Sequence, residues 1–553
     1  MSKSETVVLI SFYERTSENT RILSNILRKA GHKTYLLFFK DDRAAVIDEL
    51  KSDNTYYQLI SNFKYVGTGE DVNPPTEKEF DILVDKVMSL QPDVVGFSTR
   101  SVAKELTKKI ALRLKDLLPS ARYIAGGFGP SLDPDYFIEF IDYVCLGEGT
   151  KAILDLVELD DPTESDNVCS LKDGKLYYNK LANAEHLDTQ SIPDWSSENV
   201  FIIEDETVSN IRGFYDEKTY NIFTSIGCPA TCTYCQAAQI GHIYRKYDTQ
   251  FPKIRQRSPQ NVIEELIWAK EKFDLQNVRF IDSIFGYSKT WFYEFMDLYN
   301  KHIKLEFNAF LDERWIDDEM MAIMAKSGLQ RSVVGLQSTT EGIRKDIMGR
   351  DVKDEKIVKF SELLVKYKVP FKYDLINFNP YETNEILRKG VDFLRKLPKG
   401  EQVDIFELKI HPGSVLEDMI ARDKPTSLSN QEYEYWGLIY QLILSSDEGE
   451  EIADFALQYD SFRGQPQILS SLLTEVSSKN KTPYKLFASR DIEANERITS
   501  VMLIRKKTDV ADAIRAEKIR GLINKKTRSK ISKGSPVTIN DIYGSYEDKL
   551  PFA

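Results

Sequence analysis

The sequence predicts an α/β protein with three folded parts: an N-terminal doubly wound parallel sheet, a central partial (βα)6 barrel and a small C-terminal α+β domain. In two stretches, one before residue 150 and one between residues 220 and 420, apolar β-branched segments alternate with helical patterns. Such alternation is typical of parallel sheets with right-handed crossovers. The length of 553 residues is also too great for one ordinary domain. We expect domains at 1–160, 220–420 and 485–553, a linker at 161–219 and a helical connector at 421–484.

The composition excludes several classes of protein. Hydrophobic residues make up 42% and charged residues 29%, as in soluble globular proteins. A net charge of −12 argues against non-specific nucleic-acid binding through a basic face. We see no apolar run of about 18 residues and no signal-peptide pattern. The 5 cysteines favour a reducing compartment. We therefore expect a cytoplasmic protein with no nucleic-acid or membrane partner.

The N-terminal pattern predicts a Rossmann-like sheet. Strands are expected at Thr6–Phe12, Thr34–Phe39, Asp93–Ser98, Tyr123–Ala125 and Tyr143–Leu146, and helices at Glu18–Ala30, Glu77–Leu90, Val102–Leu118 and Pro134–Ile141. Ligands of such sheets bind beyond the carboxyl ends of the strands. The residues expected there are Ser98, Gly126, Gly127, Gly147 and Glu148. Glycines allow a bulky ligand to approach the backbone, although the same glycines could simply turn strand into helix.

Six further strands predict the barrel. They are expected at Tyr220–Gly227, Val278–Asp282, Leu305–Leu311, Ser332–Ser338, Lys372–Asn379 and Asp404–Ile410. Arg255 and Gln256 are expected to open the first helix, with Ser258 as its N-cap and Pro259 at its first position. Enzymes with βα barrels place their chemistry at the carboxyl ends of the strands. His411 follows the last strand there, so a proton-transfer or substrate-binding role competes with a structural one.

Three cysteines, Cys228, Cys232 and Cys235, follow the first barrel strand with the spacing C-x3-C-x2-C. A [4Fe–4S] cluster normally takes four thiolates, so three ligands leave one iron open to a small molecule. A structural zinc site would need a fourth protein ligand, and a disulfide framework would need an even number of cysteines. The spacing therefore favours a catalytic [4Fe–4S] cluster.

With the aromatic Tyr234 before its last cysteine, this loop resembles the radical SAM superfamily. The resemblance implies that the open iron binds S-adenosylmethionine (SAM), which is cleaved reductively to a 5′-deoxyadenosyl radical. It also implies a reducing partner such as flavodoxin or ferredoxin. The residues at the family's SAM-contact positions are Tyr234, Asp282, Asn308, Gln337, Ser338 and Asn377, where Gln337 stands in place of a glutamate and Asn377 in place of a glycine. Asp282 would hold the amino group of SAM, although an aspartate at this point could instead cap a helix.

The N-terminal segments PDVVGFST, GGFGP and DYVCLGEG, in that order, resemble the cobalamin-binding domain that precedes many radical SAM barrels. The family's loop with a cobalt-binding histidine is absent, because Ser11-Phe12-Tyr13-Glu14-Arg15 stands in its place. A bound cobalamin would therefore carry no protein imidazole on its cobalt. Ser98, Gly126, Gly127, Gly147 and Glu148 are then the expected cobalamin contacts.

An internal repeat marks the C-terminal part: Asp491–Thr499 is echoed by Lys530–Thr538. Both segments have strand-like ends around a polar turn and resemble the SAF (antifreeze-like) domain, a C-terminal module of sialic acid synthases. The sugar-binding arginine of those enzymes is not matched, because Tyr484-Lys485 stand before Leu486. The resemblance favours a carbohydrate among small-molecule substrates.

Three functions are compatible with these features. The leading one is a cobalamin-dependent radical SAM methyltransferase that acts on an unactivated carbon of a small molecule. The second keeps the radical chemistry but dehydrates, epimerises or oxidises a sugar without cobalamin. The third is a non-catalytic scaffold in polysaccharide biosynthesis, which the cysteine loop argues against. The sequence does not indicate the oligomeric state.

Overall fold

The computed structural model describes residues 4–13, 17–40, 74–172, 174–210, 218–247, 252–464, 466, 468–470, 472–473, 484–498, 502–507, 510, 512, 514 and 525–543. The chain divides into two compact units. One comprises residues 1–203 and 208–473, and the other comprises residues 204–207 and 474–553. The first unit contains the predicted doubly wound sheet and the predicted barrel, and the second contains the sequence repeat.

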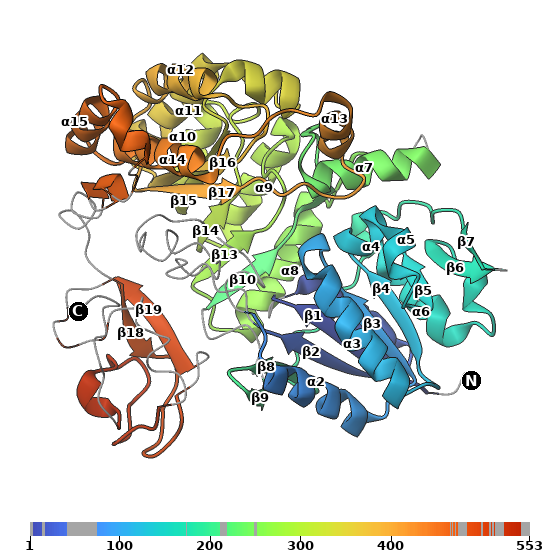
Figure 1. Cartoon of the computed structure of the whole chain (residues 1–553). Helices are drawn as coiled ribbons and strands as arrows, with labels where there is room; N and C mark the ends of the chain where they lie inside the picture. The colour runs from blue at the N-terminus through green and yellow to red at the C-terminus, as the bar shows by residue number, and fades with distance from the viewer. Residues whose placement is uncertain are drawn as a thin grey trace. The chain divides into compact units, whose positions relative to one another are not determined.

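The N-terminal sheet has nine strands in the described residues, in the order β7-β6-β5-β4-β3-β1-β2-β8-β9 (Figure 1). Its parallel centre consists of β1 (Thr6–Phe12), β2 (Lys33–Phe39), β3 (Val94–Ser98), β4 (Arg122–Gly126) and β5 (Tyr143–Cys145). Because the chain order reverses between β1 and β3, this is a doubly wound sheet, as predicted. Such a reversal opens a crevice at the carboxyl edge, where ligands bind.

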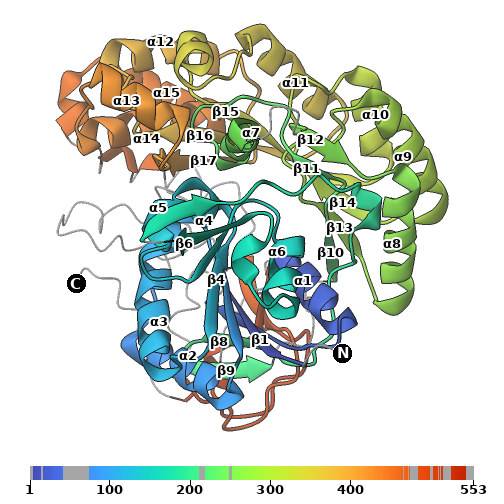
Figure 2. The ribbon, with the colours of Figure 1, turned by 90° about the vertical axis from the view of Figure 1, so that its right-hand side faces the viewer.

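Helices cover both faces of this sheet (Figure 2). One face is covered by α1 (Glu18–Lys29) and α6 (Gly149–Glu158), and the other by α2 (Glu77–Leu90) and α3 (Lys104–Leu117). Two short helices, α4 (Phe128–Leu132) and α5 (Pro134–Phe137), follow β4. Helix α1 buries Ile22 and Leu27 against the sheet. It ends before Gly31, whose φ of 93° only glycine adopts at little cost.

The segment 161–219 is not the simple linker that the sequence suggested. It contributes β6 (Val168–Lys172), β7 (Lys175–Tyr178), β8 (Val200–Glu204) and β9 (Thr207–Asn210). Strand β6 pairs antiparallel with β5 and with β7, and β8 pairs in parallel with β2. The outer strands of the parallel centre, β5 and β2, would otherwise present unpaired backbone N–H and C=O groups at the sheet edges. Pairing with β6 and β8 provides hydrogen-bond partners for these groups.

The barrel has six parallel strands in the described residues, as predicted. In spatial order they are β10 (Thr219–Ile222), β13 (Asn277–Phe280), β14 (Glu306–Ala309), β15 (Leu329–Gln337), β16 (Phe371–Asn377) and β17 (Gln402–Glu407). The helices outside them are α8 (Pro259–Lys272), α9 (Lys289–His302), α10 (Asp318–Lys326), α11 (Asp354–Lys366) and α12 (Asn384–Leu394) (Figure 2). Alternate residues of β16 are buried against the helices, so the remaining side chains face the inside of the barrel.

The described elements after the last barrel strand include the helices α13 (Val415–Asp423), α14 (Asn430–Ser445) and α15 (Asp447–Ala456). All residues from Tyr433 to Leu444 are buried, so α14 is a core helix, as its sequence predicted. In the described residues of the chain we find no helix that is both long and apolar enough to cross a membrane.

The first barrel strand is shorter than predicted. Backbone pairing with β13 ends at Ile222, and Ser225–Gly227 forms a separate strand, β11. Strand β11 pairs antiparallel with β12 (Ile254–Gln256), whose residues were expected to open a helix. Helix α8 does begin as predicted, because the side chain of Ser258 accepts a hydrogen bond from the backbone N–H of Asn261 and Pro259 follows. The β11–β12 pair thus carries the cysteine loop beyond the barrel edge.

The described residues of the C-terminal unit include an antiparallel pair, β18 (Tyr484–Ala488) and β19 (Leu503–Lys507), and most of the two repeated segments. The repeats pair with each other: Ile492 donates to Ile531 at 2.9 Å, and Ile531 donates back at 2.8 Å. Their turn residues, Asn495 and Gly534, both have positive φ, at 65° and 80°. The sequence repeat therefore corresponds to a structural one, with equivalent residues facing each other.

Candidate functional site

The cysteine loop is held by backbone contacts on both sides. The N–H of Cys228 donates to the carbonyl of Lys253, the residue before β12, at 3.2 Å. The N–H and Oγ1 of Thr233 donate to the carbonyls of Met348 and Ile347, at 3.1 and 2.6 Å. Thr233 in turn accepts from the N–H of Leu416 at 3.2 Å. The loop is therefore clamped between β12, the turn before residue 350 and the start of α13.

The three thiols lie in a shielded place. Cys232 is 6% exposed, while Cys228 and Cys235 are half-buried. Burial, with a smaller effect of the other two thiols, raises the pKa of the Cys228 thiol to about 11, as expected of groups that lie close together. Tyr234, also half-buried, has a pKa raised by burial and by the neighbouring Cys232. Because iron deprotonates a thiol that it binds, a high pKa in the free protein is compatible with ligation.

The donor set fits an iron–sulfur cluster better than a single ion. Within the described ranges, no three histidine, cysteine or acidic side chains converge as they would around one ion. A [4Fe–4S] cluster does not need such convergence, because each thiolate binds a different iron. Three cysteine thiols from one loop, and no fourth cysteine in its sequence, match a cluster with one open iron.

A buried ion network lies beside the loop. Arg350, which is 6% exposed, forms ion pairs with Asp312 at 3.0 Å and with Glu313 at 2.8 Å. Arg314 pairs with the same Asp312 at 2.8 Å. The positive charges of Arg350 and Arg314 lower the pKa of the Cys232 thiol, against the raising effect of burial. The cluster loop therefore faces two guanidinium groups.

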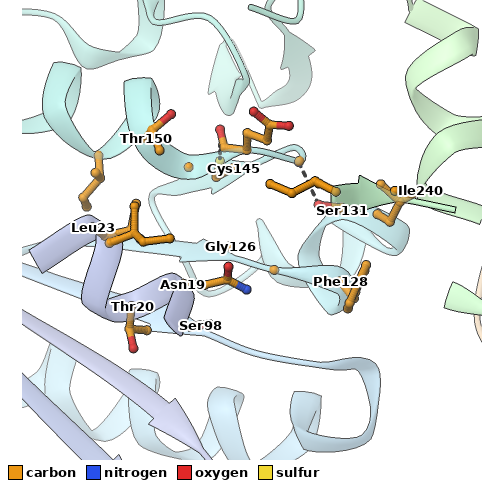
Figure 3. A pocket seen from close by; sticks show the side chains of 18 of the residues that line it. Asn19, Thr20, Leu23, Ser98, Gly126, Phe128, Ser131, Cys145, Thr150 and Ile240 are labelled. Carbon is orange, nitrogen blue, oxygen red and sulfur yellow. Dashed lines mark hydrogen bonds between the residues drawn. The ribbon is translucent and has the colours of Figure 1, made fainter. Parts of the chain in front are cut away.

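A cavity of about 280 Å³ lies at the carboxyl edge of the N-terminal sheet (Figure 3). Ser98, Gly126, Gly127, Gly147 and Glu148, the residues predicted there, all line it. It opens where the strand order reverses, between β1 and β3, which is the ligand crevice of this fold. A Cβ atom on Gly126 would meet only the Cβ of Cys145 at 3.5 Å, so the edge is open to a bulky ligand. A large, flat cofactor fits this combination of glycines and apolar walls.

Helix α7 (Gln236–Tyr247) begins directly after Cys235 and closes the other side of this cavity. Figure 3 shows Ile240 of α7 across the cavity from Leu23 of α1. A Cβ atom on Gly147 would lie 1.6 Å from the hydroxyl oxygen of Tyr244, so this position accepts only glycine. Arg255 of β12 forms an ion pair with Glu148. The cysteine loop and the cavity are thus joined by one helix.

Two of the residues predicted to contact SAM form hydrogen bonds with other residues of the protein. Asp282, which is 1% exposed, accepts hydrogen bonds from the N–H and Oγ1 of Thr224 and from Oγ of Ser225. It therefore holds the start of β11 and is not a helix cap, since Ser288 stands at the N-cap of the next helix, α9. Asn377 donates to the carbonyl of Tyr433 at 2.7 Å and accepts from Phe378, so it anchors α14.

The other predicted barrel residues lie within β14 and at the carboxyl end of β15. Asn308, half-buried on β14, donates to Oε1 of Gln330 at 3.0 Å. Gln337 sits at an irregularity of β15 with φ of 62°, and its amide folds back over Gly335. Ser338 donates to the carboxyl of Glu382 at 2.6 Å. Burial raises the pKa of Glu382 to about 7.

His411 lies between the barrel and the N-terminal sheet. Its Nδ1 atom is 3.0 Å from Nε2 of Gln236, the first residue of α7. The same Nε2 donates to Oγ of Ser101, just after β3, at 3.0 Å. Gln236 therefore connects three segments that are more than 100 residues apart in sequence: the cluster loop, the last barrel strand and the sheet.

Two family models match the chain. The model for the radical SAM superfamily matches residues 222–394, and the model for the B12 binding domain matches residues 63–157. The chain contains a radical SAM domain and a B12-binding domain. The cofactors of such a protein are a [4Fe–4S] cluster, SAM and cobalamin. The cluster loop lies within the radical SAM match, and the sheet-edge residues Ser98, Gly126, Gly127, Gly147 and Glu148 lie within the B12-binding match.

Solved structures with a similar fold include OxsB, titled a cobalamin-dependent S-adenosylmethionine radical enzyme, with aqua-cobalamin and S-adenosylmethionine bound. It is 15% identical with a TM-score of 0.57, over 84% of this chain and 72% of that chain. Another is TsrM, a radical S-adenosylmethionine methyltransferase from Kitasatospora setae, with cobalamin and a [4Fe-4S] cluster bound. It is 15% identical with a TM-score of 0.54, over 76% of this chain and 75% of that chain. At this identity the likeness shows the fold. No curated protein matches the chain by sequence.

Several residues at the two domains' sites escaped the sequence analysis. They are Arg350, Asp312 and Gln236 beside the cluster loop of the radical SAM domain, and Tyr244 and Arg255 at the cavity of the B12-binding domain. Only Gln236 carried a local signal, its position directly after Cys235. The other four residues reach these sites only through tertiary packing, which no short sequence motif predicts.

Proposed function

We propose that the protein is a cobalamin-dependent radical SAM methyltransferase that acts on an unactivated carbon of a small molecule. The observation that supports this most directly is helix α7, which starts at the cysteine loop and then lines the cavity with Ala237, Ile240, Gly241 and Tyr244. One rigid element thus joins the two cofactor sites. An enzyme that uses both cofactors on one substrate needs such fixed positioning.

When bound, the cluster and SAM supply a carbon-centred radical, and cobalamin supplies a methyl group. The chain's own residues bind and orient these groups. We assign the cluster to Cys228, Cys232 and Cys235, and cobalamin to the cavity edge at Ser98, Gly126, Gly127, Gly147 and Glu148. We assign Asp282 and Asn377 to the support of these sites, because Asp282 accepts hydrogen bonds from Thr224 and Ser225 and Asn377 donates to the Tyr433 carbonyl.

We assign SAM to the carboxyl edge of the barrel, at Tyr234, Asn308 and Gln337. All three are half-buried, so their side chains combine a fixed position with access to a ligand. Ser338 lies beside them but donates its hydroxyl proton to Glu382, so we assign it to positioning of this edge. A reductant such as flavodoxin or ferredoxin would supply the electron.

We further propose a carbohydrate as the substrate class, on the weaker ground of the C-terminal repeat. The reciprocal pairing of Ile492 with Ile531 supports a genuine duplicated module, as in the SAF domain that the sequence resembles. The module's surface ion pairs, such as Arg490 with Glu496 at 2.6 Å, offer polar groups.

The test uses a matched pair of glycine substitutions. A Cβ atom on Gly241, which lines the cavity, would meet only the Arg245 guanidinium at 3.6 Å, and one on exposed Gly342 would meet nothing within 4 Å. Gly241→Leu should therefore fill the cavity without a backbone clash. We expect it to abolish hydroxocobalamin binding, measured by corrinoid absorbance of anaerobically purified protein, while iron content stays at the wild-type level. Gly342→Leu should change neither.

Full corrinoid binding by Gly241→Leu would show that cobalamin lies elsewhere. A wild-type protein that cleaves SAM to 5′-deoxyadenosine but binds no corrinoid would favour the sugar dehydratase, epimerase or oxidase alternative. Replacement of Cys228, Cys232 or Cys235 by alanine should abolish 5′-deoxyadenosine formation. If it does not, the assignment of the cluster to this loop is wrong.

A further inference from the structure

Two arginines on the inner face of the barrel form no hydrogen bond or ion pair with the described residues. They are Arg279 on β13 and Arg331 on β15. The Nε atom of Arg331 is buried, yet it has no hydrogen-bond partner in the described part of the chain. The buried arginines of the radical SAM domain, by contrast, each form an ion pair with a carboxylate: Arg257, Arg344 and Arg350. A shielded guanidinium without a partner is costly, and a bound anion would supply the missing partner.

The strand register places these two arginines on either side of Asn308. Arg279 pairs with Asn308 of β14, and Asn308 pairs with Arg331. Val278 and Phe280, which flank Arg279, are buried in the core between the strands and the outer helices, so Arg279 points to the inside of the barrel. Neighbouring strands lie about 4.8 Å apart, so the Cα atoms of the two arginines are about 10 Å apart. Side chains as long as arginine can therefore contact one ligand between them, over Asn308.

This part of the barrel interior is open to solvent. Arg279 is exposed, and Asn308 and Arg331 are half-buried. Arg331 precedes Gln337, which we assigned to SAM, on the same strand, and Arg279 precedes the strand-end residue Asp282. Because the parallel strands all run toward the carboxyl edge, both arginines lie deeper in the barrel than that edge. They are therefore placed to contact a substrate that lies inside the barrel, below SAM.

The acidic side chains of β14, β16 and β17 that face inward already have donors of their own. Lys372 lies 2.9 Å from Asp374 and 2.6 Å from Asp404. Burial raises the pKa of Asp374 to about 6, while Lys372 and, to a smaller extent, Arg331 lower it. Glu306 accepts a hydrogen bond from the neighbouring strand. The carboxylates of the inner face are thus engaged, whereas the donors of the two guanidinium groups lack acceptors.

The number of these donors favours a phosphate group over a carboxylate. A guanidinium presents two parallel N–H donors to an oxyanion, and the two oxygens of one carboxylate satisfy one such fork. A phosphate or diphosphate group has oxygens for two forks. We propose that Arg279 and Arg331 bind a phosphate group of the substrate. The inference names a substrate class, a phosphorylated small molecule, and rests on the proposed function only in taking the barrel interior as the substrate site.

The test is isothermal titration calorimetry of the full-length protein with its cluster and with SAM in excess, and the probe is pyrophosphate. SAM occupies the open iron, which would otherwise bind the probe. Arg279→Met and Arg331→Met should each weaken pyrophosphate binding at least about tenfold, because each removes a charged hydrogen-bond donor. Arg388→Met is the matched control, because Arg388 is exposed on the outer helix α12 and its loss changes the net charge equally. This variant should bind pyrophosphate as the wild type does.

No detectable binding by the wild type, or equal affinity in the wild type and Arg279→Met, would overturn the proposal. Arg279 is exposed, so Arg279→Met should fold even if Arg331→Met does not. Tighter binding of acetate than of pyrophosphate would indicate a carboxylate site instead. Weaker SAM binding in Arg279→Met than in Arg388→Met would assign the arginines to the carboxylate of SAM and would also overturn it. A wild type that binds pyrophosphate but no corrinoid would contradict the proposed methyl transfer alone.

Discussion

The amide Nε2 of Gln236 lies 3.0 Å from the ring Nδ1 of His411. An amide nitrogen only donates, so Nδ1 must accept, and the neutral ring carries its proton on Nε2. Burial lowers the pKa of His411 as well, which also favours the neutral ring. His411, a candidate for proton transfer from its sequence position, is therefore held as one neutral tautomer that can donate only from Nε2.

Gln236→Glu should raise the pKa of His411. A carboxylate at this position would accept a proton from Nδ1 and stabilise the imidazolium ring. The measurement is a pH titration of the histidine ring signals by nuclear magnetic resonance. The exposed His186 provides an internal control, because it lies near Asp188 on a different segment and should titrate as in the wild type. An unchanged titration of His411 in Gln236→Glu would contradict the assigned contact.

Glu382→Gln should remove one source of pH-dependent stability. Burial raises the pKa of Glu382 to about 7 in the folded protein, from 4.5 as its ordinary value. The folded state then binds more protons than the unfolded state between these pH values, so stability falls as pH rises from about 4.5 to 7. Complete ionisation of Glu382 would lower the free energy of unfolding by on the order of 3 kcal/mol, because one pKa unit corresponds to about 1.4 kcal/mol.

Thermal unfolding at pH 5 and pH 8 measures this effect. Glu382→Gln keeps an oxygen that can accept the proton of Ser338, so it should lose less stability between the two pH values than the wild type. Glu385→Gln is the matched control, because this side chain is exposed and its ion pair with Lys389 contributes little. A Glu382→Gln protein with the wild-type pH dependence would show that Glu382 titrates normally.

Gly147→Ala should destabilise the protein through its contact with Tyr244. A new methyl group would overlap the Tyr244 ring, and Gly147 also has φ of 77°. Gly174 has a similar φ of 73° but nothing within 4 Å of its Cβ position, so Gly174→Ala isolates the conformational cost. We expect both variants to lose about 1–2 kcal/mol of the free energy of unfolding because of the backbone conformation. Gly147→Ala should lose about 1–3 kcal/mol more because of overpacking. Chemical denaturation without cobalamin measures the difference, and the additional Tyr244→Ala change should recover part of it.

Gly349→Ala should displace the cluster loop. The new Cβ atom would lie within 2.6 Å of the Thr231 carbonyl oxygen, which cannot move without the adjacent Cys232. We expect a lower iron content after anaerobic reconstitution, measured by iron and sulfide analysis. Gly31→Ala, with φ of 93° and open surroundings, is the control and should bind iron as the wild type does. Normal iron content in Gly349→Ala would show that the loop tolerates a shift of this turn.

Local patterns predicted the strands and the fold class because burial acts on each segment separately. The apolar runs of β1 and β3 and the alternation in β16 are direct consequences of which faces are covered. Local patterns did not predict the strands β6 to β9. These short segments become strands only because they pair with the edges of an existing sheet. At Asp282 the local pattern did not predict the hydrogen bonds from Thr224 and Ser225, because these residues lie far from Asp282 in sequence.

The sequence by itself determined the chemistry that the chain can support. Three cysteines in one loop and glycines after successive parallel strands are local features, and their meaning follows from ligand number and backbone freedom. Only the tertiary structure decided which groups surround that chemistry. Arg350 and Tyr244 reach the cluster loop and the cavity through long-range packing, and such contacts depend on the positions of whole elements in space. No short stretch of sequence encodes that information.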